Sequence, residues 1–276
     1  MKKLNEVDPQ QINERLYPVG PIYEALSSPD QFTDDHVRLF WQQGFLAIEH
    51  LLNKAEITAA TEAISDIIAH PGQLGRVEFT KPRAEIEAAE LELSVRKVYQ
   101  FAADEPRLGE LTRHSVLVSL IERLLGERSK LVQDMALLKP PHGGGEKPWH
   151  QDMAYGPLAF NKAVIGAWIA LDEAGVDNGC MHVIPYSQRE GATPHYAIRD
   201  WQICDTSVPV NRSIAVPLKP GGVLLFHGLL YHGTPYNFST KRRRALQFHY
   251  APESAVKLGP KEYKQFFTNE MTNAEC

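Results

Sequence analysis

Residues 215–251 read AVPLKPGGVLLFHGLLYHGTPYNFSTKRRRALQFHYA. This stretch holds three short apolar or alternating runs, at Ala215–Leu218, Val223–His227 and Ala245–Ala251. Turn-forming residues separate them, with Pro220-Gly221-Gly222 before the second run and residues 237–240 before the third. Short runs of this kind between turns are typical of β-strands, so the stretch predicts the last part of a β-rich core.

The same pattern extends upstream to residue 131. Further runs cover Leu131–Lys139, Val164–Asp172 and Met181–Pro185, and turn residues again lie between them. Several short strands after a helical half indicate an antiparallel sandwich or jelly roll with helices packed against one sheet. Residues 191–212 show no clear period, and loops of that length are often lids or binding loops.

The first part of the chain is predicted to be helical. Thr33 caps a segment with apolar residues at helical spacing, which ends at Gly44 before a short strand at Phe45–Ile48. Lys54–His70 and Leu111–Leu125 are two further amphipathic helices. We expect one mainly β domain with flanking helices over residues 1–276. Its helical part spans about 1–130, its β core about 131–252 and its C-terminal tail 253–276.

Composition excludes several classes of protein. Lys and Arg number 29 and Asp and Glu 34, which gives a formal charge of −5, and the pI of about 6.1 argues against nucleic-acid binding. No apolar run approaches the ~18 residues of a membrane span, and the N-terminus lacks the apolar region of a secretory signal. The three cysteines, at 180, 204 and 276, are odd in number and far apart. They cannot build a disulfide framework, which fits a reducing, cytoplasmic location. The sequence does not indicate an oligomeric state.

One short motif carries metal-binding chemistry. His150 and Asp152 are two residues apart, so in an extended segment they project from the same face and can bind one metal. His232, after a predicted strand, can supply a third ligand. Two histidines and one carboxylate with open positions form the facial triad of non-haem Fe(II) oxygenases. A structural zinc site would need four ligands, commonly thiolates, and no cysteine lies near these positions.

A nearby arginine strengthens this interpretation. Enzymes with this triad commonly use 2-oxoglutarate, whose distal carboxylate needs a cation, and Arg243 follows His232 by eleven residues. The alternative is that 241–244, Lys-Arg-Arg-Arg, is a solvated charge run, which we accept for Lys241 and Arg242. Strand alternation groups Arg243 with Ala245, Gln247 and His249, and Arg244 with Leu246, Phe248 and Tyr250. We interpret the polar face as the barrel lumen and the apolar face as packing beneath the helices. His227 is a competing ligand, but Phe238 stands eleven residues after it.

The sequence resembles the phytanoyl-CoA dioxygenase family of Fe(II)/2-oxoglutarate oxygenases. The resemblance covers roughly residues 95–252. It is strongest in Lys139-Pro140-Pro141, Trp149-His150-Gln151-Asp152, Asn178-Gly179-Cys180 and 226–243. It implies a double-stranded β-helix (jelly-roll) core preceded by helices. It also implies His150, Asp152 and His232 as iron ligands and Arg243 as the anchor of the co-substrate's distal carboxylate.

The resemblance extends to further pocket residues. It implies that Trp168, Thr234, Gln133 and Lys97 lie near the co-substrate, and we place Tyr155 on the substrate side. Each has a structural alternative: Trp168 as plain core, Thr234 as a turn residue, Gln133 as a satisfied barrel residue and Tyr155 as a packing residue. We also expect pocket walls from 191–212 and from a helical region at 81–95.

The implied activity is that of an Fe(II)- and 2-oxoglutarate-dependent dioxygenase. Such an enzyme uses O₂ to hydroxylate an unactivated C–H bond of a small molecule and releases succinate and CO₂, with ascorbate as the expected reductant in vitro. Asp152 favours oxygen transfer, because related halogenases carry a small residue there. Two alternatives stay open: the same chemistry with desaturation, cyclisation or epimerisation, and a non-catalytic jelly roll that binds a ligand. The family accepts acyl-CoA thioesters, amino acids and natural-product scaffolds, and no basic cluster here is diagnostic of CoA.

Overall fold

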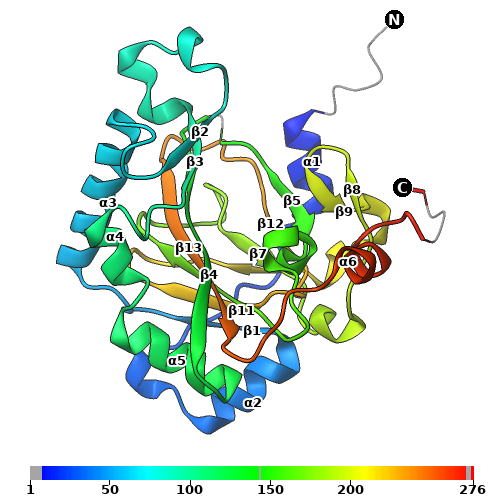
Figure 1. Cartoon of the computed structure of the whole chain (residues 1–276). Coiled ribbons are helices and arrows are strands. Elements are labelled where there is room, and N and C mark those ends of the chain that lie inside the picture. Colours follow the sequence, from blue (N-terminus) through cyan, green and yellow to red (C-terminus); the bar gives the residue numbers. More distant parts are fainter. Residues whose placement is uncertain (1–7, 143, 272–274) are drawn as a thin grey trace, which may run out of the picture.

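The structure is a computed structural model that describes residues 8–142, 144–271 and 275–276. Two antiparallel sheets form its centre (Figure 1). The large sheet has the strand order β1 (Phe45–Ile48), β11 (Val223–His227), β6 (Ile165–Ala170), β13 (Arg243–Pro252), β4 (Ser129–Lys139), β3 (Val95–Tyr99) and β2 (Arg76–Phe79). The small sheet has the order β10 (Ile214–Val216), β7 (Met181–Val183), β12 (His232–Thr234) and β5 (Lys147–His150). A separate hairpin consists of β8 (His195–Ala197) and β9 (Trp201–Ile203).

Four helices cover the outer face of the large sheet (Figure 1). They are α2 (Asp34–Gln43), α3 (Lys54–Ala69), α4 (Pro106–Leu111) and α5 (Ser115–Leu125). Helix α1 (Pro9–Leu16) contacts the small sheet, where the Trp149 indole N–H donates to the Leu16 carbonyl. Helix α6 (Pro260–Phe267) packs through Phe267 against the segment that follows β5.

Strand alternation explains why both faces of the large sheet are buried. On β13, Leu246 and Phe248 pack outward against the helices. Trp168 of β6 and Phe226 of β11 pack inward against the small sheet. Because successive side chains point to opposite faces, one apolar strand supplies both layers of core. The predicted jelly roll with helices on one sheet is confirmed.

Several predicted elements have different bounds. The predicted helix Leu111–Leu125 is interrupted, because α4 ends at Leu111 and α5 begins at Ser115 with His114 as its N-cap. The helical region expected at 81–95 is wrong, since it forms three short 3-10 turns, Arg83–Glu85, Ala88–Glu90 and Glu92–Ser94. Residues 191–212 contain the β8–β9 hairpin rather than only a loop. The predicted helical part also supplies β1, β2 and β3, of which only β1 was expected. The division of the chain into one domain stays a prediction.

The cysteines differ from expectation. Cys204 and Cys276 form a disulfide, while Cys180 is buried and free. The three cysteines were expected to build no disulfide framework, and this bond does not fit the reducing location inferred from that expectation. A separation of 72 residues is closed because the chain after α6 returns to the loop that follows β9. Within the described ranges, no helix is both long and apolar enough to cross a bilayer.

Candidate active site

Two histidines meet because of the register of the small sheet. Strands β5 and β12 pair so that His150 lies directly opposite His232, with ring centroids 4.1 Å apart. The Nδ1 atom of His150 is 2.7 Å from the Pro148 carbonyl, and that of His232 is 2.9 Å from the Leu230 carbonyl. Since a carbonyl only accepts, each Nδ1 carries the proton. Both Nε2 lone pairs are therefore available as metal ligands.

Asp152 completes a cluster of three ligands. The chain turns into a 3-10 turn at Asp152–Ala154 directly after β5. Asp152 Oδ1 lies 3.2 Å from His150 Nε2 and 3.4 Å from His232 Nε2. One ligand atom from each residue lies within 4.8 Å of the others, and all three residues are buried. Two imidazoles and one carboxylate grouped in this way match the ligand set of non-haem iron oxygenases.

Two residues of β13 hold the other oxygen of Asp152. His249 Nε2 lies 2.7 Å from Asp152 Oδ2, and the Gln247 side-chain amide donates to the same oxygen at 3.2 Å. Burial opposes ionisation of Asp152, but the neighbouring His232 and His249 keep its pKa well below the usual value. The carboxylate is therefore ionised and fixed in orientation. Strand alternation predicted Gln247 and His249 on the lumen face, but no role for them could be predicted from the sequence.

Arg243 is a buried cation with unused donors. It pairs across the sheet with Lys139 of β4, and its side chain lies 5.2 Å from the Trp168 ring. Among the described residues, none accepts a hydrogen bond from Arg243 Nε or Nη1, and the Trp168 indole N–H is likewise unpaired. Burial lowers the pKa of Arg243 to about 10. An unpaired buried guanidinium is costly, and a carboxylate ligand supplies the partner that it lacks.

The three cations next to Arg243 pair with carboxylates outside the pocket. Arg244 pairs with Asp172 at 2.9 Å, Lys241 with Glu173 at 3.2 Å, and Arg242 with Glu92 at 2.7 Å. Leu246, Phe248 and Tyr250 lie beneath the helices. The alternation predicted for this strand is confirmed, because only Arg243 of the run lines the pocket.

All nine residues predicted for the site line one pocket. They are His150, Asp152, His232, Arg243, Trp168, Thr234, Gln133, Lys97 and Tyr155. The Tyr155 ring stands edge-on to His150 at 5.7 Å. Lys97 forms an ion pair with Glu78 at 2.8 Å, so in this structure its ammonium has a protein partner. The individual roles of these side chains stay predictions. His227, the competing ligand, lies outside the cluster and accepts from the Leu229 N–H.

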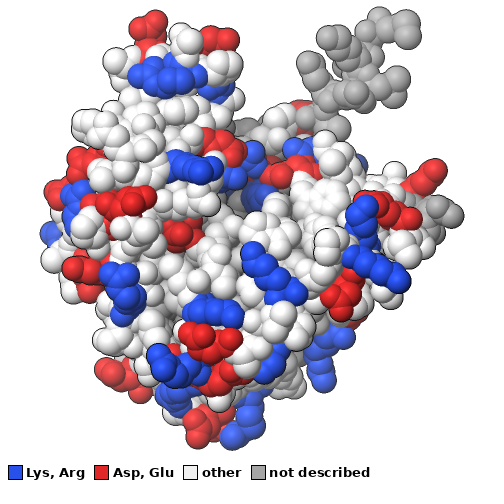
Figure 2. Space-filling model, in the orientation of Figure 1, with Lys and Arg blue, Asp and Glu red and all other residues white. Residues whose placement is uncertain are grey.

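Further charged residues line the pocket that were not predicted from the sequence. Lys139 is buried and donates to the Gly145 and Pro235 carbonyls, and burial together with Arg243 lowers its pKa well below the usual value. Arg96 and Lys147 also line the pocket. The space-filling view shows a hollow with Lys and Arg side chains at its wall, between the lobe that carries β2 and the opposite side (Figure 2). A lysine at the end of an apolar strand was the available signal for Lys139.

Comparisons with known proteins identify a matching family and similar proteins. A family model described as "Phytanoyl-CoA dioxygenase (PhyH)" matches residues 40–245. A Caenorhabditis elegans protein named "Probable phytanoyl-CoA dioxygenase" is 27% identical over 236 residues, which cover 78% of this chain and 73% of that protein.

Two solved structures of similar fold are those of EvdO2 and SnoK. EvdO2 from Micromonospora carbonacea var. aurantiaca, complexed with 2-oxoglutarate, has a TM-score of 0.68 and 21% identity, with 87% of this chain and 99% of that chain covered. The carbocyclase SnoK from nogalamycin biosynthesis has a TM-score of 0.65 and 22% identity, with 87% and 92% covered. At these identities the likeness concerns the fold.

Proposed function

The chain belongs to the phytanoyl-CoA dioxygenase family, and on that premise we propose that it hydroxylates an unactivated C–H bond of a small-molecule substrate. As an Fe(II)/2-oxoglutarate-dependent dioxygenase it releases succinate and CO₂. The observation that carries the proposal is the buried cluster of His150, Asp152 and His232 in the same pocket as the unpaired Arg243. Fe(II) and 2-oxoglutarate, when bound, supply the activation of O₂.

The protein's own residues hold and orient these groups. Burial and the neighbouring His232 lower the pKa of His150 to about 4, so its imidazole is neutral and able to ligate at neutral pH. The guanidinium of Arg243 binds the distal carboxylate of the co-substrate, and the Trp168 ring packs against that guanidinium. Gln247 and His249 keep the Asp152 carboxylate in position.

The outcome of the oxidation is a separate question. SnoK shares the fold and is described as a carbocyclase, so one scaffold supports outcomes other than hydroxylation. Hydroxylation adds one oxygen atom to the substrate, whereas desaturation or cyclisation removes two hydrogens and epimerisation leaves the mass unchanged. The mass of the product therefore distinguishes these outcomes. We propose a cytoplasmic location, which the composition favours and which the Cys204–Cys276 disulfide does not support.

The experiment is a substrate-free turnover assay. Protein is supplied with Fe(II), 2-oxoglutarate, O₂ and ascorbate, and succinate is measured. We expect slow succinate formation that disappears in Asp152→Ala and persists in Asp66→Ala, a surface carboxylate that pairs with Arg107. A non-catalytic jelly roll predicts no succinate from the wild-type protein, and that result would refute the proposal.

A further inference from the structure

A β-bulge directs two adjacent cations to the pocket. In the pairing of β2 with β3, Glu78 lies opposite Lys97 and Phe79 lies opposite Val95, so Arg96 is an extra residue without a partner on β2. Val95 and Val98 both pack into the core beneath the helices. In a regular strand, residues three apart face opposite sides, and the bulge removes that difference. Arg96 and Lys97 consequently both line the pocket.

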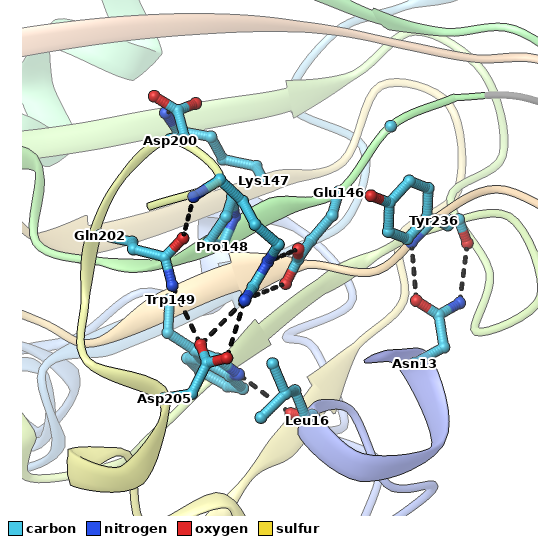
Figure 3. Close-up of polar contacts among 12 residues, drawn as sticks. Asn13, Leu16, Glu146, Lys147, Pro148, Trp149, Asp200, Gln202, Asp205 and Tyr236 are labelled. Carbon is cyan, nitrogen blue, oxygen red and sulfur yellow. Dashed lines mark hydrogen bonds and ion pairs between the residues drawn. The ribbon is translucent and has the colours of Figure 1, made fainter. Parts of the chain in front are cut away.

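A third cation reaches the same place from the small sheet. Lys147 of β5 lines the pocket, and its ammonium lies against the Tyr155 hydroxyl. Arg96 Nη2 lies 2.6 Å and Lys147 Nζ 2.7 Å from one atom, Asp200 Oδ2. Figure 3 shows the side chains of Lys147 and Asp200 directed toward one another. A single carboxylate oxygen thus bridges cations from the two sheets, so their spacing fits an oxyanion. We call Arg96 and Lys147 the clamp.

The carboxylate of Asp200 occupies the position between Arg96 and Lys147 where the oxyanion of a ligand would bind. It lies in the turn of the β8–β9 hairpin, where its Oδ1 accepts from the Trp201 N–H at 2.7 Å. The hairpin has its own anchors, since the Trp201 indole donates to the Ala154 carbonyl and Arg199 pairs with Glu146 and Asp205. Figure 3 shows Glu146 and Asp205 in this network. These anchors hold the hairpin without the clamp. A ligand can therefore displace the Asp200 carboxylate from Arg96 and Lys147 while the hairpin stays in place.

The charge around the clamp is unbalanced. Three cations, Arg96, Lys97 and Lys147, face two carboxylates, Glu78 and Asp200. Glu146 is already engaged by Arg199 at 2.8 Å and does not neutralise the excess. One positive charge remains, which favours a ligand with an acidic group.

The clamp is also close to the metal ligands. Lys147 contacts Tyr155, and the Tyr155 ring stands against His150. The same pocket is also lined by the apolar side chains of Met135, Leu137 and Leu158. A substrate held by its acidic group at the clamp can therefore extend an apolar body toward the metal centre.

From these observations we propose that the substrate is a small organic acid whose oxyanion binds between Arg96 and Lys147 in place of the Asp200 carboxylate. This inference rests on the proposed function, since it names the substrate class of that site. Carboxylates and phosphate monoesters share the required chemistry. Arg96 is the residue that determines this specificity, while Tyr155 and the apolar wall receive the rest of the molecule.

The test compares acids with their uncharged amides. Binding of 3-phenylpropanoate and 3-phenylpropanamide, and of hexanoate and hexanamide, is measured by calorimetry. The protein is loaded with Fe(II) and 2-oxoglutarate without O₂. We expect each acid to bind roughly tenfold more tightly than its amide, a difference on the scale of one charge-assisted contact. Phenyl phosphate is the further arm that distinguishes a phosphate monoester from a carboxylate.

Two variants that break the same ion pair give opposite results under the proposal. Arg96→Gln removes a clamp cation, so the preference for the acid disappears, and Arg96→Lys retains part of it. Asp200→Asn removes the competing carboxylate, so the acids bind more tightly and the amides do not change. Arg123→Gln on α5, which removes an ion pair with Asp34 of α2, is the matched control and keeps the preference. Thermal unfolding of each variant establishes that it is folded.

Three results would overturn the inference. They are equal or undetectable binding of acid and amide to the wild-type protein, a preference that survives in Arg96→Gln, and weaker binding of acids to Asp200→Asn. If the Arg96–Asp200 pair were merely structural, Asp200→Asn would weaken the binding of acids just as Arg96→Gln does, because both variants break that pair. Succinate formation without any probe, measured on the same protein, tests the proposed function separately. If the protein forms succinate but binds acids no more tightly than amides, the proposed role of the clamp is refuted and the proposed function is not.

Discussion

His249 holds the carboxylate of Asp152 from the side opposite the metal cluster. Its Nε2 lies 2.7 Å from Asp152 Oδ2, while Oδ1 of the same carboxylate faces His150 and His232. His249 lies on β13 and Asp152 follows β5, so the contact joins the two sheets at the site. A residue that orients a ligand in this way influences metal affinity without touching the metal.

We therefore expect His249→Ala to weaken Fe(II) binding by roughly 10- to 100-fold, the usual effect of losing such a partner. His249→Gln keeps an N–H donor and should recover part of the affinity. Anaerobic titration with Fe(II) measures both variants. The control is His227→Ala, a buried histidine outside the cluster. Equal Fe(II) affinity in His249→Ala and wild type would show that Asp152 does not need this contact.

A second prediction concerns the unpaired charge of Arg243. A buried cation without a partner destabilises the free protein, and replacing it with an apolar residue of similar length removes that cost. We expect Arg243→Met to leave the melting temperature of the free protein unchanged or raised, while the stabilisation by added 2-oxoglutarate is lost. The Michaelis constant for 2-oxoglutarate should rise roughly 100-fold, as expected for about 3 kcal/mol of charge-assisted hydrogen bonding.

The control for this variant is its neighbour. Arg244→Met removes the outward-facing pair with Asp172 and should leave the response to 2-oxoglutarate intact. Loss of the response in both variants would indicate damage to β13 rather than loss of an anchor. An unchanged Michaelis constant in Arg243→Met would mean that the anchor is misassigned.

The strands with continuous apolar runs could be predicted from the sequence. Val223–His227 and Phe45–Ile48 have the predicted bounds, because each is a short buried run between turn residues. The strands β2 and β3 could not be predicted, since Arg76–Phe79 and Val95–Tyr99 are short, charged and lie at one edge of the sheet. The pairing of β3 with β4 and of β2 with β3 decides that they are strands, and pairing is not local.

The same distinction applies to the site. His150 and Asp152 share a local motif, and the spacing from His232 to Arg243 is a local signal across one turn. The contacts of Asp152 with Gln247 and His249 join residues 95 and 97 positions apart. The bulge at Arg96 depends on the register of β2 against β3. Register is set by long-range packing, so neither feature could be derived from composition or periodicity.

A third prediction tests the packing behind the metal ligands. A Cβ added to Gly166 of β6 would lie 2.3 Å from Cζ of Phe226, whose ring stands 4.6 Å from the His232 ring. Gly166→Ala should therefore destabilise the fold by about 1–3 kcal/mol, the usual cost of overpacking. It should also weaken Fe(II) binding, because the displaced ring lies against a ligand. Gly156→Ala is the control, since a Cβ there meets no atom within 4 Å.

The double variant Gly166→Ala/Phe226→Leu restores space and should recover part of the Fe(II) affinity. Unfolding by denaturant and anaerobic metal titration measure the two effects separately. Additive losses in the double variant would contradict the proposed clash, because residues in contact are expected to couple.

The last prediction concerns the C-terminus. The disulfide between Cys204 and Cys276 joins the last residue to the loop directly before Asp205, which binds Arg199. It closes a loop of 72 residues, and cross-links of this kind typically stabilise by about 2–4 kcal/mol. We expect a reductant to lower the unfolding free energy of the wild-type protein by an amount in that range. Cys276→Ser should match the reduced wild type and no longer respond to reductant, and a non-reduced peptide map should contain the Cys204–Cys276 pair only in the wild type. Equal stability of the wild type with and without reductant, while the map shows the pair, would mean that the bond pins only the terminal segment and contributes nothing to the core.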